Sequence, residues 1–385
     1  MKRMGWLIVV CCLILSVAPR KVEAAALEVA GKSAVLMDVA TGTVLYESNS
    51  HEALAPASVT KVMTMLLIME AIDSGRIGWE DTVTASEAAA SKGGSQIYLK
   101  VGESMTVTDM VKSIAVSSAN DCACAMAEHL YGSETAFVEQ MNKRAKELGM
   151  NDTTFVNCTG LDDAPEAANH KTSAYDIALM SSQLLKNHPD IKKFTTIWMD
   201  TVRSGAFGLA NTNKMVRFYS GCTGLKTGFT SGAGYCLSAS AQRDGMELIA
   251  VVMGSTTSQE RVAACKSMLD YGFANFAIYT PKLETEPQVP VTLGRAKTAA
   301  AVPAEAPALL VEKGQLSSIT TEVTLEETVA APVSQGQRLG TLTIRAGQQV
   351  LRQIPLVAEK AVERKSWSDI FVDILRSVAM AKPQE

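Results

Sequence analysis

The stretch Ser58-Val-Thr-Lys-Val-Met-Thr-Met-Leu-Leu-Ile-Met-Glu-Ala-Ile72 predicts a helix that decides how the rest of the chain packs. Apolar side chains occur on nearly every side of this helix, at Met63, Leu66, Leu67 and Met69 among other positions. A helix that is apolar all round is normally buried, so we expect it at the centre of the fold. Pro56 precedes the helix and helps to set its start.

Two polar side chains stand at the beginning of this helix, Ser58 and Lys61. Residues three apart share one face of a helix, so the hydroxyl and the amine are expected to meet. Apolar surroundings desolvate the Lys61 ammonium and lower its pKa, and a neutral lysine can take the serine proton. A random Ser-x-x-Lys pattern is more often a cap serine and a surface lysine, but the buried character of this helix argues against that interpretation.

A second string, Ser118-Ala-Asn120, lies in a break between two helical patterns. A loop there can point a hydroxyl and an amide into a cleft. Ser118 would relay a proton between Lys61 and a leaving amine, and Asn120 would bind an amide carbonyl. Taken alone, such a turn is usually only a helix cap, so its functional interpretation depends on the other strings.

The third string consists of Lys226, Thr227 and Gly228, at the end of a predicted strand. The glycine lets a substrate backbone come close, the threonine offers a hydroxyl, and the lysine offers a charge that attracts a carboxylate. The backbone N–H groups of Phe229 and Ser58 together would form an oxyanion hole. A histidine base is not indicated, because none of the four histidines lies in a recognisable catalytic string: His51, His129, His170 and His188.

The three strings, in this order, resemble those of the penicillin-recognising serine enzymes. The closest resemblance is to the D-alanyl-D-alanine carboxypeptidases of bacterial wall maintenance, the low-molecular-weight penicillin-binding proteins. The similarity runs from about Leu27 to Phe276. This sequence departs from the family pattern at Ala119, where members often have glycine, and at Phe229, where some members have histidine. Further strings support it: Ala55-Pro-Ala-Ser-Val-Thr-Lys61, Gly160-Leu-Asp162, Asn211-Thr-Asn-Lys214, Gly224-Leu-Lys-Thr-Gly-Phe-Thr230 and Ala233-Gly-Tyr235.

The resemblance implies a mechanism and a substrate. Ser58 would be the acylated nucleophile and Lys61 its base, with Ser118 and Asn120 as the second motif and no metal or other cofactor. Arg261 sits where the family places an arginine near the substrate carboxylate. The implied substrate is a peptidoglycan stem peptide, and β-lactams would acylate the same serine. The substrate-binding set would be Lys226, Thr227, Gly228, Phe229 and Arg261.

The pattern of the first 280 residues predicts an α/β (α+β) domain in which helices pack on one antiparallel sheet. The resemblance identifies its type as the β-lactamase/transpeptidase fold. The predicted strands are Ser33–Asp38, Thr43–Glu47, Gly221–Thr227, Gly234–Ala241 and Met246–Gly254. The other predicted helices are Thr108–Val116, Asp121–Leu130, Glu134–Leu148, His170–Leu185 and Arg261–Phe273.

Composition shifts near residue 280 to Val, Thr and Pro without a long helical period, which predicts a small all-β domain over residues 280–360. Its predicted strands are Gln288–Thr292, Ile319–Leu325, Leu339–Ile344 and Val350–Val357. Residues 361–385 then carry an apolar stripe at helical spacing, from Trp367 to Val378. We expect this amphipathic helix to lie on the outer surface of the cytoplasmic membrane; docking on the β domain or on a second copy is the alternative.

Residues 1–25 are typical of a cleaved signal peptide, with Lys2 and Arg3 before the apolar run Trp6–Leu15. An uncleaved anchor is the alternative, although the run is short for a membrane-spanning helix. We therefore expect an exported protein, whose serine peptidase domain occupies residues 26–279. Six cysteines follow the signal, and we expect buried core thiols, since their spacing matches no small disulfide scaffold. They are Cys122, Cys124, Cys158, Cys222, Cys236 and Cys265.

Composition narrows the class of partner. A net charge of −4 without a basic run, together with 5% aromatic residues, argues against nucleic acid. Cys122 and Cys124 with His129 lack a second ligand pair for zinc. The predicted function is removal of the terminal D-alanine from stem pentapeptides through an acyl-enzyme. The alternatives are a β-lactamase and a non-enzymatic penicillin-binding wall or sensor module.

Overall fold

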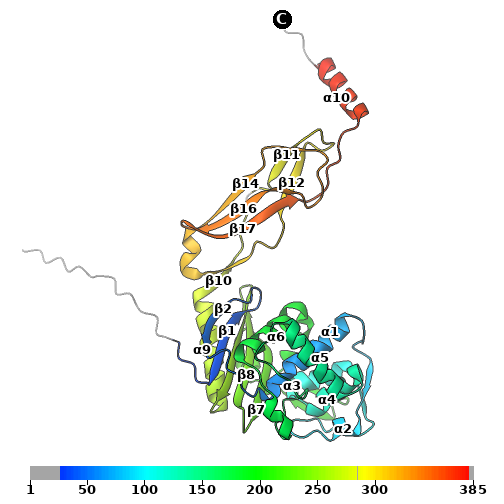
Figure 1. The fold of residues 1–385 in the computed structure, drawn as a ribbon, viewed down its shortest axis with the longest axis vertical. Helices are drawn as coiled ribbons and strands as arrows, with labels where there is room; N and C mark the ends of the chain where they lie inside the picture. The colour runs from blue at the N-terminus through cyan, green and yellow to red at the C-terminus, as the bar shows by residue number, and fades with distance from the viewer. Residues whose placement is uncertain (1–26, 284, 381–385) are drawn as a thin grey trace, which may run out of the picture.

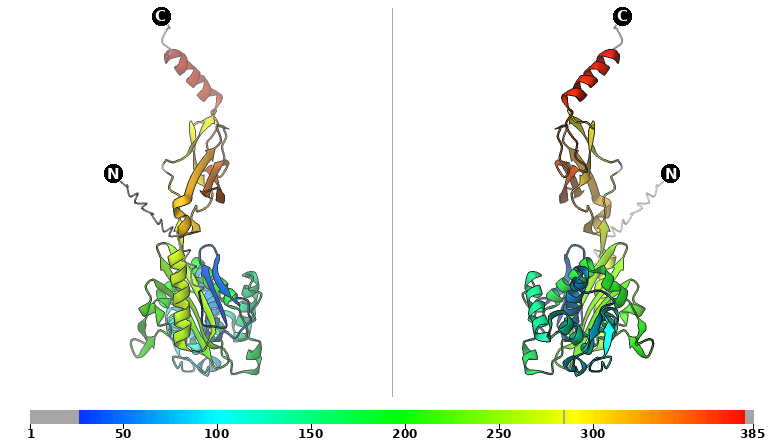
Figure 2. Two further views of the ribbon diagram at one scale, coloured as in Figure 1. Left: turned by 90° about the vertical axis from the view of Figure 1, so that its left-hand side faces the viewer. Right: turned by 90° about the vertical axis from the view of Figure 1, so that its right-hand side faces the viewer.

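The computed structural model describes residues 27–283 and 285–380, with side chains to residue 376. The predicted signal peptide, residues 1–25, lies outside the described residues. A large N-terminal domain, a slender β-rich domain and a terminal helix follow one another along the long axis of the molecule (Figure 1). The two views of Figure 2, each turned by 90° from Figure 1, show the same succession.

A five-stranded antiparallel sheet organises the large domain, in the order β2-β1-β9-β8-β7. Alternate residues of a strand face opposite sides, and in β1 Val35 and Met37 pack on one face while Ala34 and Leu36 pack on the other. Both faces are therefore covered. The strands are β1 (Ser33–Asp38), β2 (Val44–Ser48), β7 (Cys222–Thr230), β8 (Gly234–Arg243) and β9 (Met246–Ser255).

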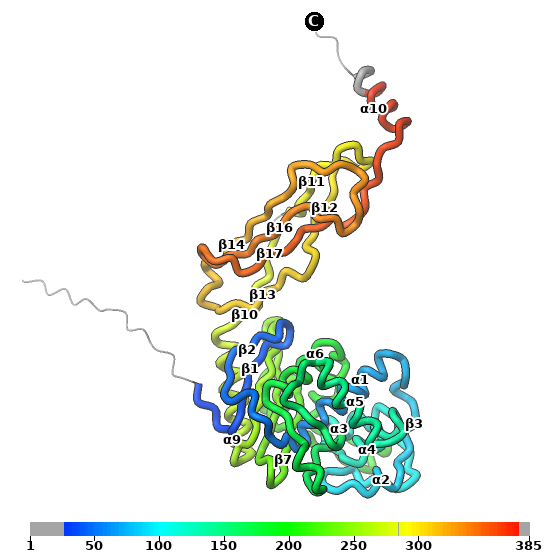
Figure 3. The backbone as a smooth tube through the Cα atoms, viewed as in Figure 1, coloured from blue at the N-terminus to red at the C-terminus, as the bar shows by residue number. Residues whose placement is uncertain are grey.

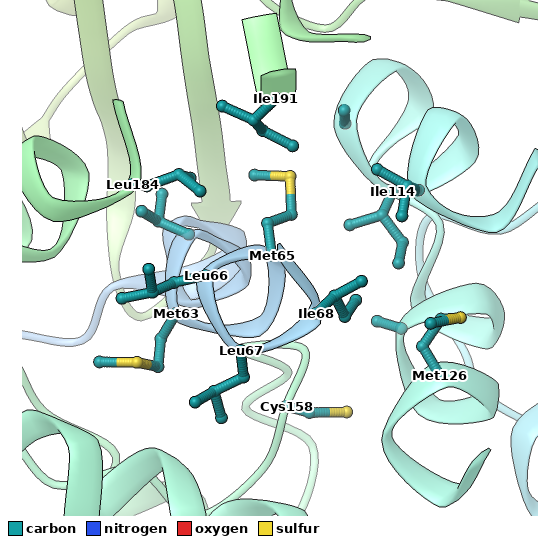
Figure 4. Packing of buried hydrophobic residues seen from close by; sticks show 14 of the residues in the cluster. Met63, Met65, Leu66, Leu67, Ile68, Ile114, Met126, Cys158, Leu184 and Ile191 are labelled. Atoms are coloured by element: carbon teal, nitrogen blue, oxygen red, sulfur yellow. The ribbon is translucent and has the colours of Figure 1, made fainter. Parts of the chain in front are cut away.

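One face of the sheet carries most of the helices, with α1 (Lys61–Asp73) in their middle. Ten of the thirteen residues of α1 are buried, as its apolar composition predicts. Figure 4 looks along α1 and shows its side chains pointing outward in every direction, toward Leu184 and Ile191 on one side and Ile114 and Met126 on another. The opposite face is covered by α9 (Ser258–Asn275), which begins with a capping box of Thr257 and Glu260.

Further helices, turns and strand pairs complete this domain. The remaining helices are α2 (Glu87–Ala90), α3 (Val107–Ser117), α4 (Asn120–Tyr131), α5 (Glu134–Glu147), α6 (Ala174–Asn187), α7 (Lys192–Thr195) and α8 (Met215–Phe218). The 3-10 turns are η1 (Ala57–Thr60), η2 (Pro165–Asn169) and η3 (Pro189–Ile191). Two small antiparallel pairs are β3 (Thr82–Thr84) with β4 (Ser104–Thr106) and β5 (Met199–Val202) with β6 (Phe207–Ala210).

Two boundaries differ from the prediction near the motifs. The helix predicted over Ser58–Ile72 is a 3-10 turn, η1, followed by α1 from Lys61. Lys226, Thr227 and Gly228 lie within β7 and not at its end, because pairing with β8 continues to Thr230. Phe229 and Thr230, which follow Gly228, still pair with β8 before the hairpin turns.

A two-stranded ribbon of β10 (Phe276–Tyr279) and β13 (Leu309–Glu312) connects the two domains. The second domain contains a six-stranded sheet in the order β14-β16-β17-β12-β11-β15 and the 3-10 turn η4 (Lys313–Ser318). The prediction of a helix-and-sheet domain followed by an all-β domain is confirmed. The strands are β11 (Gln288–Thr292), β12 (Thr298–Pro303), β14 (Ile319–Leu325), β15 (Val329–Ala330), β16 (Arg338–Ala346) and β17 (Gln349–Ala358).

The terminal helix α10 (Trp367–Met380) stands beyond the β-rich domain (Figure 3). Most of its large apolar side chains up to residue 376 are exposed, including Trp367 at 87% and Phe371 at 62%. Within residues 27–283 and 285–380, no helix combines the length and apolarity needed to cross a membrane. The six cysteines of this part of the chain are free thiols, and all but the half-buried Cys222 are buried.

Candidate active site

Ser58 and Lys61 meet at the junction of η1 and α1. The Nζ atom of Lys61 lies 2.9 Å from Oγ of Ser58 and donates a hydrogen bond of 2.8 Å to the backbone carbonyl of Thr159. The single 3-10 turn places Ser58 at the entrance of the helix, half-buried, with Lys61 directly behind it. The amine is therefore held by two oxygens in one orientation.

Lys61 has no exposed surface, although it is a lysine. Burial disfavours the charged form and lowers its pKa from 10.5 to about 7. A neutral amine keeps a lone pair, so the Thr159 carbonyl can hold one N–H while the lone pair accepts the proton of Ser58. The geometry and the pKa together allow Lys61 to act as a base near neutral pH.

Ser118 and Asn120 lie at the junction of α3 and α4, two helices that pack against α1. Ser118 ends α3 in a left-handed conformation, with φ of 64°. Nδ2 of Asn120 donates to the carbonyl of Gly93 at 2.7 Å, which fixes the amide. Ser118 Oγ and Asn120 Oδ1 are buried and, among the described residues, have no hydrogen-bond partner. Buried polar atoms are normally paired, so these two atoms are ready for groups of a ligand.

The strand β7 forms the opposite wall of the site. A β-carbon built on Gly228 would lie 3.1 Å from the backbone nitrogen of Ser58 and 2.6 Å from the carbonyl oxygen of Pro56. Only a glycine lets β7 approach the nucleophile turn so closely. Lys226 is buried on this strand, and Nζ donates to the carbonyl of Thr227 at 2.9 Å. Thr227 Oγ1 donates to Thr212 Oγ1 at 2.7 Å.

Arg261 reaches the same strand from α9. Its Nη1 donates to the carbonyls of Gly228 at 2.8 Å and Cys236 at 3.1 Å, so it joins β7 to β8 at the glycine. Its guanidinium also stands 5.2 Å from the ring of Tyr235, which packs on Phe229. The Phe229 side chain is 53% exposed at this edge of the sheet. Arg261 therefore supports the wall of the site from behind.

Lys61, Lys226 and Arg261 lie close enough at the base of the site for their charges to interact. Burial, and then the charges of Lys61 and Arg261, hold the pKa of Lys226 well below its usual value. An incoming carboxylate would favour the charged form of Lys226 again. Among the residues that the structure describes, no group of three or more His, Cys, Asp or Glu side chains is placed to hold a metal ion.

Two residues behind the nucleophile turn were not indicated by the sequence. His170 Nδ1 accepts the backbone N–H of Val156 at 3.1 Å, so Nε2 carries the proton and donates to Thr60 Oγ1 at 2.8 Å. Thr60 in turn donates to the carbonyl of Ala57 at 2.8 Å. Burial lowers the pKa of His170 to about 4, which keeps this ring neutral. The other residue is Thr159, whose contribution is a backbone carbonyl and leaves no trace in a motif.

Comparison with known proteins places this site in a family. Residues 20–257 match the D-alanyl-D-alanine carboxypeptidase family, and residues 282–364 match the C-terminal domain of penicillin-binding protein 5. The chain belongs to the D-alanyl-D-alanine carboxypeptidase family. The two matched ranges fall on the two domains of this family member. The family resemblance inferred from the three strings is confirmed.

Individual relatives of this carboxypeptidase family member cover most of its length. The D-alanyl-D-alanine carboxypeptidase DacF of Bacillus subtilis is 45% identical over 339 residues, 86% of each chain. Penicillin-binding protein 5 of Haemophilus influenzae is similar in structure, with a TM-score of 0.73, 30% identity and coverage of 88% of this chain and 98% of that one. Penicillin-binding protein D2 of Listeria monocytogenes in its ampicillin-bound form matches 64% of this chain and 99% of that one, with 31% identity and a TM-score of 0.59.

Proposed function

We propose that this chain is a serine-type D-Ala-D-Ala carboxypeptidase that removes the terminal D-alanine from peptidoglycan stem pentapeptides. Ser58 is the nucleophile and Lys61 its general base. The observation that carries the proposal is the 2.9 Å approach of Nζ of the fully buried Lys61 to Oγ of the half-buried Ser58. Family membership and the 45% identity to a named carboxypeptidase support the reaction type.

Acylation begins when Ser58 Oγ attacks the carbonyl of the penultimate D-alanine and its proton passes to Nζ of Lys61. The backbone N–H groups of Ser58 and Phe229 stabilise the resulting oxyanion, which is why β7 must lie against η1. Ser118 Oγ, buried and unpaired among the described residues, relays the proton from Lys61 to the departing amine. Water then hydrolyses the ester of Ser58, and Lys61 serves again as base.

Substrate binding uses the second and third motifs. The carboxylate of the terminal D-alanine approaches Lys226 and the hydroxyl of Thr227, and its charge restores the proton on Lys226. The amide of Asn120 binds the peptide backbone: Oδ1 is free to accept an N–H, and the second hydrogen of Nδ2 can donate to a carbonyl. Penicillin acylates the same serine, as the ampicillin-bound relative suggests.

Release of D-alanine from a pentapeptide ending in D-Ala-D-Ala tests the proposal directly. The wild-type chain should release D-alanine, and Ser58→Ala should release none while keeping its far-UV circular dichroism spectrum and melting temperature. A labelled penicillin should form one covalent adduct, which Ser58→Ala loses. Absence of both D-alanine and the adduct with Ser58 intact would refute the proposal.

The same experiment separates the alternative functions. A β-lactamase would hydrolyse penicillin in many turnovers and leave the pentapeptide intact. A penicillin-binding module without enzymatic activity would keep its adduct and release no D-alanine. We expect D-alanine release to exceed penicillin turnover by a wide margin.

We also propose that the protein is exported and attached to the outer face of the cytoplasmic membrane through α10. The charged start and apolar run of residues 2–15 support export. The exposed side chains of Trp367, Phe371, Ile374 and Leu375 support attachment, since they offer an apolar surface for the interface region of a bilayer. The sheet domain that carries the site lies at the other end of the molecule from α10 (Figure 1).

Flotation with vesicles of phosphatidylcholine and phosphatidylglycerol tests the attachment. The wild-type chain should float with the vesicles, and a Phe371→Asp, Leu375→Asp double variant should stay in solution with unchanged penicillin acylation. The matched control is Arg376→Ala, which leaves the apolar side chains in place. Equal flotation of the double variant and the control would contradict attachment through α10.

A further inference from the structure

A polar cavity beside the active site holds charges that the proposed mechanism does not use. Its volume is about 510 Å³, and four charged side chains line it: Lys92, Glu134, Asp163 and Glu166. Lys92 and Glu134 form an ion pair of 2.5 Å and neutralise each other. Asp163 and Glu166 are exposed, and their side chains form no ion pair or hydrogen bond with any residue that the structure describes. These two carboxylates are therefore left for a ligand.

The cavity adjoins the catalytic groups through two backbone carbonyls. The carbonyl of Gly93 accepts the 2.7 Å hydrogen bond from Asn120 Nδ2. The carbonyl of Thr159 accepts the 2.8 Å hydrogen bond from Lys61 Nζ. Gly93 and Thr159 both line the cavity, so the same two loops border the cavity and hold the catalytic side chains. A group bound in the cavity would thus lie next to the active site.

The rim between the cavity and the Asn120 amide is thin. A β-carbon built on Gly94 would lie 2.8 Å from Asn120 Nδ2 and 3.2 Å from Cδ2 of Leu161. Leu161 lines the cavity. Only a glycine lets the loop pass so close to both side chains. Asn120 and the cavity lining therefore approach the same point of this loop.

In the proposed function the substrate peptide passes this rim. Asn120 Oδ1 is buried, has no hydrogen-bond partner among the described residues, and is the atom that would accept an N–H of the peptide. If that N–H belongs to the penultimate D-alanine, the α-carbon of the residue before it lies about 3.8 Å further along the peptide. The side chain of this preceding residue then begins beside Asn120 and Gly94, and a long side chain can reach the cavity.

The charges of the cavity select the kind of side chain. One lysine and three carboxylates line it, so its field favours a cation. A lysine-type side chain carries an ammonium group on a flexible four-carbon stem. The stem would contact the apolar lining residues Val156, Leu161 and Ala164. The ammonium group would then meet Asp163 and Glu166.

We propose that this cavity binds the side-chain amine of the residue that precedes D-Ala-D-Ala in the stem peptide. Asp163 and Glu166 thereby determine a preference for a diamino acid at this position, because a neutral side chain gains nothing from their charge. Salt screens exposed charges, so the preference weakens as the ionic strength rises. This inference rests on the proposed function and names a determinant of its substrate specificity.

Two matched peptides test the proposal, acetyl-Lys-D-Ala-D-Ala and acetyl-norleucine-D-Ala-D-Ala, which differ only in the ammonium group. The measured quantity is kcat/KM for release of D-alanine by the full chain. The wild type should favour the lysine peptide by about fivefold, the size expected of an exposed ion pair. This ratio should fall toward one in about 0.5 M sodium chloride.

A double variant, Asp163→Asn with Glu166→Gln, should bring the ratio to about one in dilute buffer as well. Both peptides are measured on one preparation, so the ratio does not depend on the fraction of folded protein. The matched control is Glu80→Gln with Glu139→Gln, which removes two exposed carboxylates outside the cavity lining. The control should keep the ratio of the wild type.

The outcomes separate the two proposals. Equal kcat/KM values for the two peptides in the wild type, or a preference that the Asp163 and Glu166 variant keeps, would overturn the amine site. A ratio lowered equally in the control would also overturn it, since the net charge of the chain would then be responsible. Absence of D-alanine release from both peptides, together with absence of a penicillin adduct, would instead refute the proposed function.

Discussion

Gly228 lies so close to the nucleophile turn that a β-carbon on it would stand 3.1 Å from the backbone nitrogen of Ser58. The two residues are 170 positions apart in the sequence, and their approach is what brings β7 to the entrance of α1. The oxyanion hole proposed here needs one N–H from each of these two elements. The contact is therefore a requirement of the chemistry as well as of the packing.

Gly228→Ala tests this contact. The added methyl group would collide with the backbone of η1, so β7 must move and its N–H at Phe229 leaves the oxyanion. We expect penicillin acylation to fall by about 100-fold, in the range measured for loss of one oxyanion donor. The matched control is Gly208→Ala in β6, where a β-carbon meets nothing within 4 Å. Equal acylation rates in the two variants would contradict the assignment.

We predict that Arg261 does more than contact the substrate, because it also holds β7 in position. Arg261→Ala removes two hydrogen bonds to the carbonyls of Gly228 and Cys236, and we expect it to cost about 1–3 kcal/mol in the free energy of unfolding. The melting temperature and kcat should both fall. If Arg261 only bound the substrate carboxylate, KM would rise while the melting temperature stayed constant. Lys266→Ala, on the same helix, is the control.

His170 is predicted to make the protein sensitive to acid. Its pKa is 6.5 in the reference state and about 4 in the folded protein, so the unfolded chain binds more protons between these values. Folding stability from this group is complete above pH 6.5 and is lost as the pH falls toward 4. The loss between pH 7.5 and 5 should be roughly 2 kcal/mol.

Urea unfolding of the wild type and His170→Gln at these two pH values checks this prediction. The variant lacks the titrating ring, so its stability should change less with pH than that of the wild type by about the stated amount. An identical pH dependence in the two proteins would show that His170 is not the group responsible.

Much of the architecture follows from local pattern. The apolar stretch Val62–Met69 predicted a buried central helix, and β1 was predicted with its observed bounds because a short apolar run is followed by a turn at Gly42. The ribbon of β10 and β13 was not predicted, since its two strands are short and pair across 29 intervening residues. Pairing of this kind depends on the fold and is not visible in either strand alone.

The residues of the candidate site also fall into two groups, those that the sequence predicts and those that it does not. Side chains that do chemistry, such as Ser58 and Lys226, are visible because their residue types and order are unusual. Thr159 contributes only a carbonyl, and His170 acts through Thr60, so neither has a pattern of its own. Their roles appear only when the chain brings residues about 100 positions apart into hydrogen-bond distance.

The pH dependence of penicillin acylation tests the central claim, that a neutral Lys61 takes the proton of Ser58. The pKa of Lys61 is about 7, so the neutral form is abundant above this pH and falls tenfold for each pH unit below it. We predict that the acylation rate follows this curve between pH 5.5 and 9, with circular dichroism confirming that the chain stays folded. A rate that is constant across this range, with Ser58 labelled throughout, would contradict the role of Lys61 as the base.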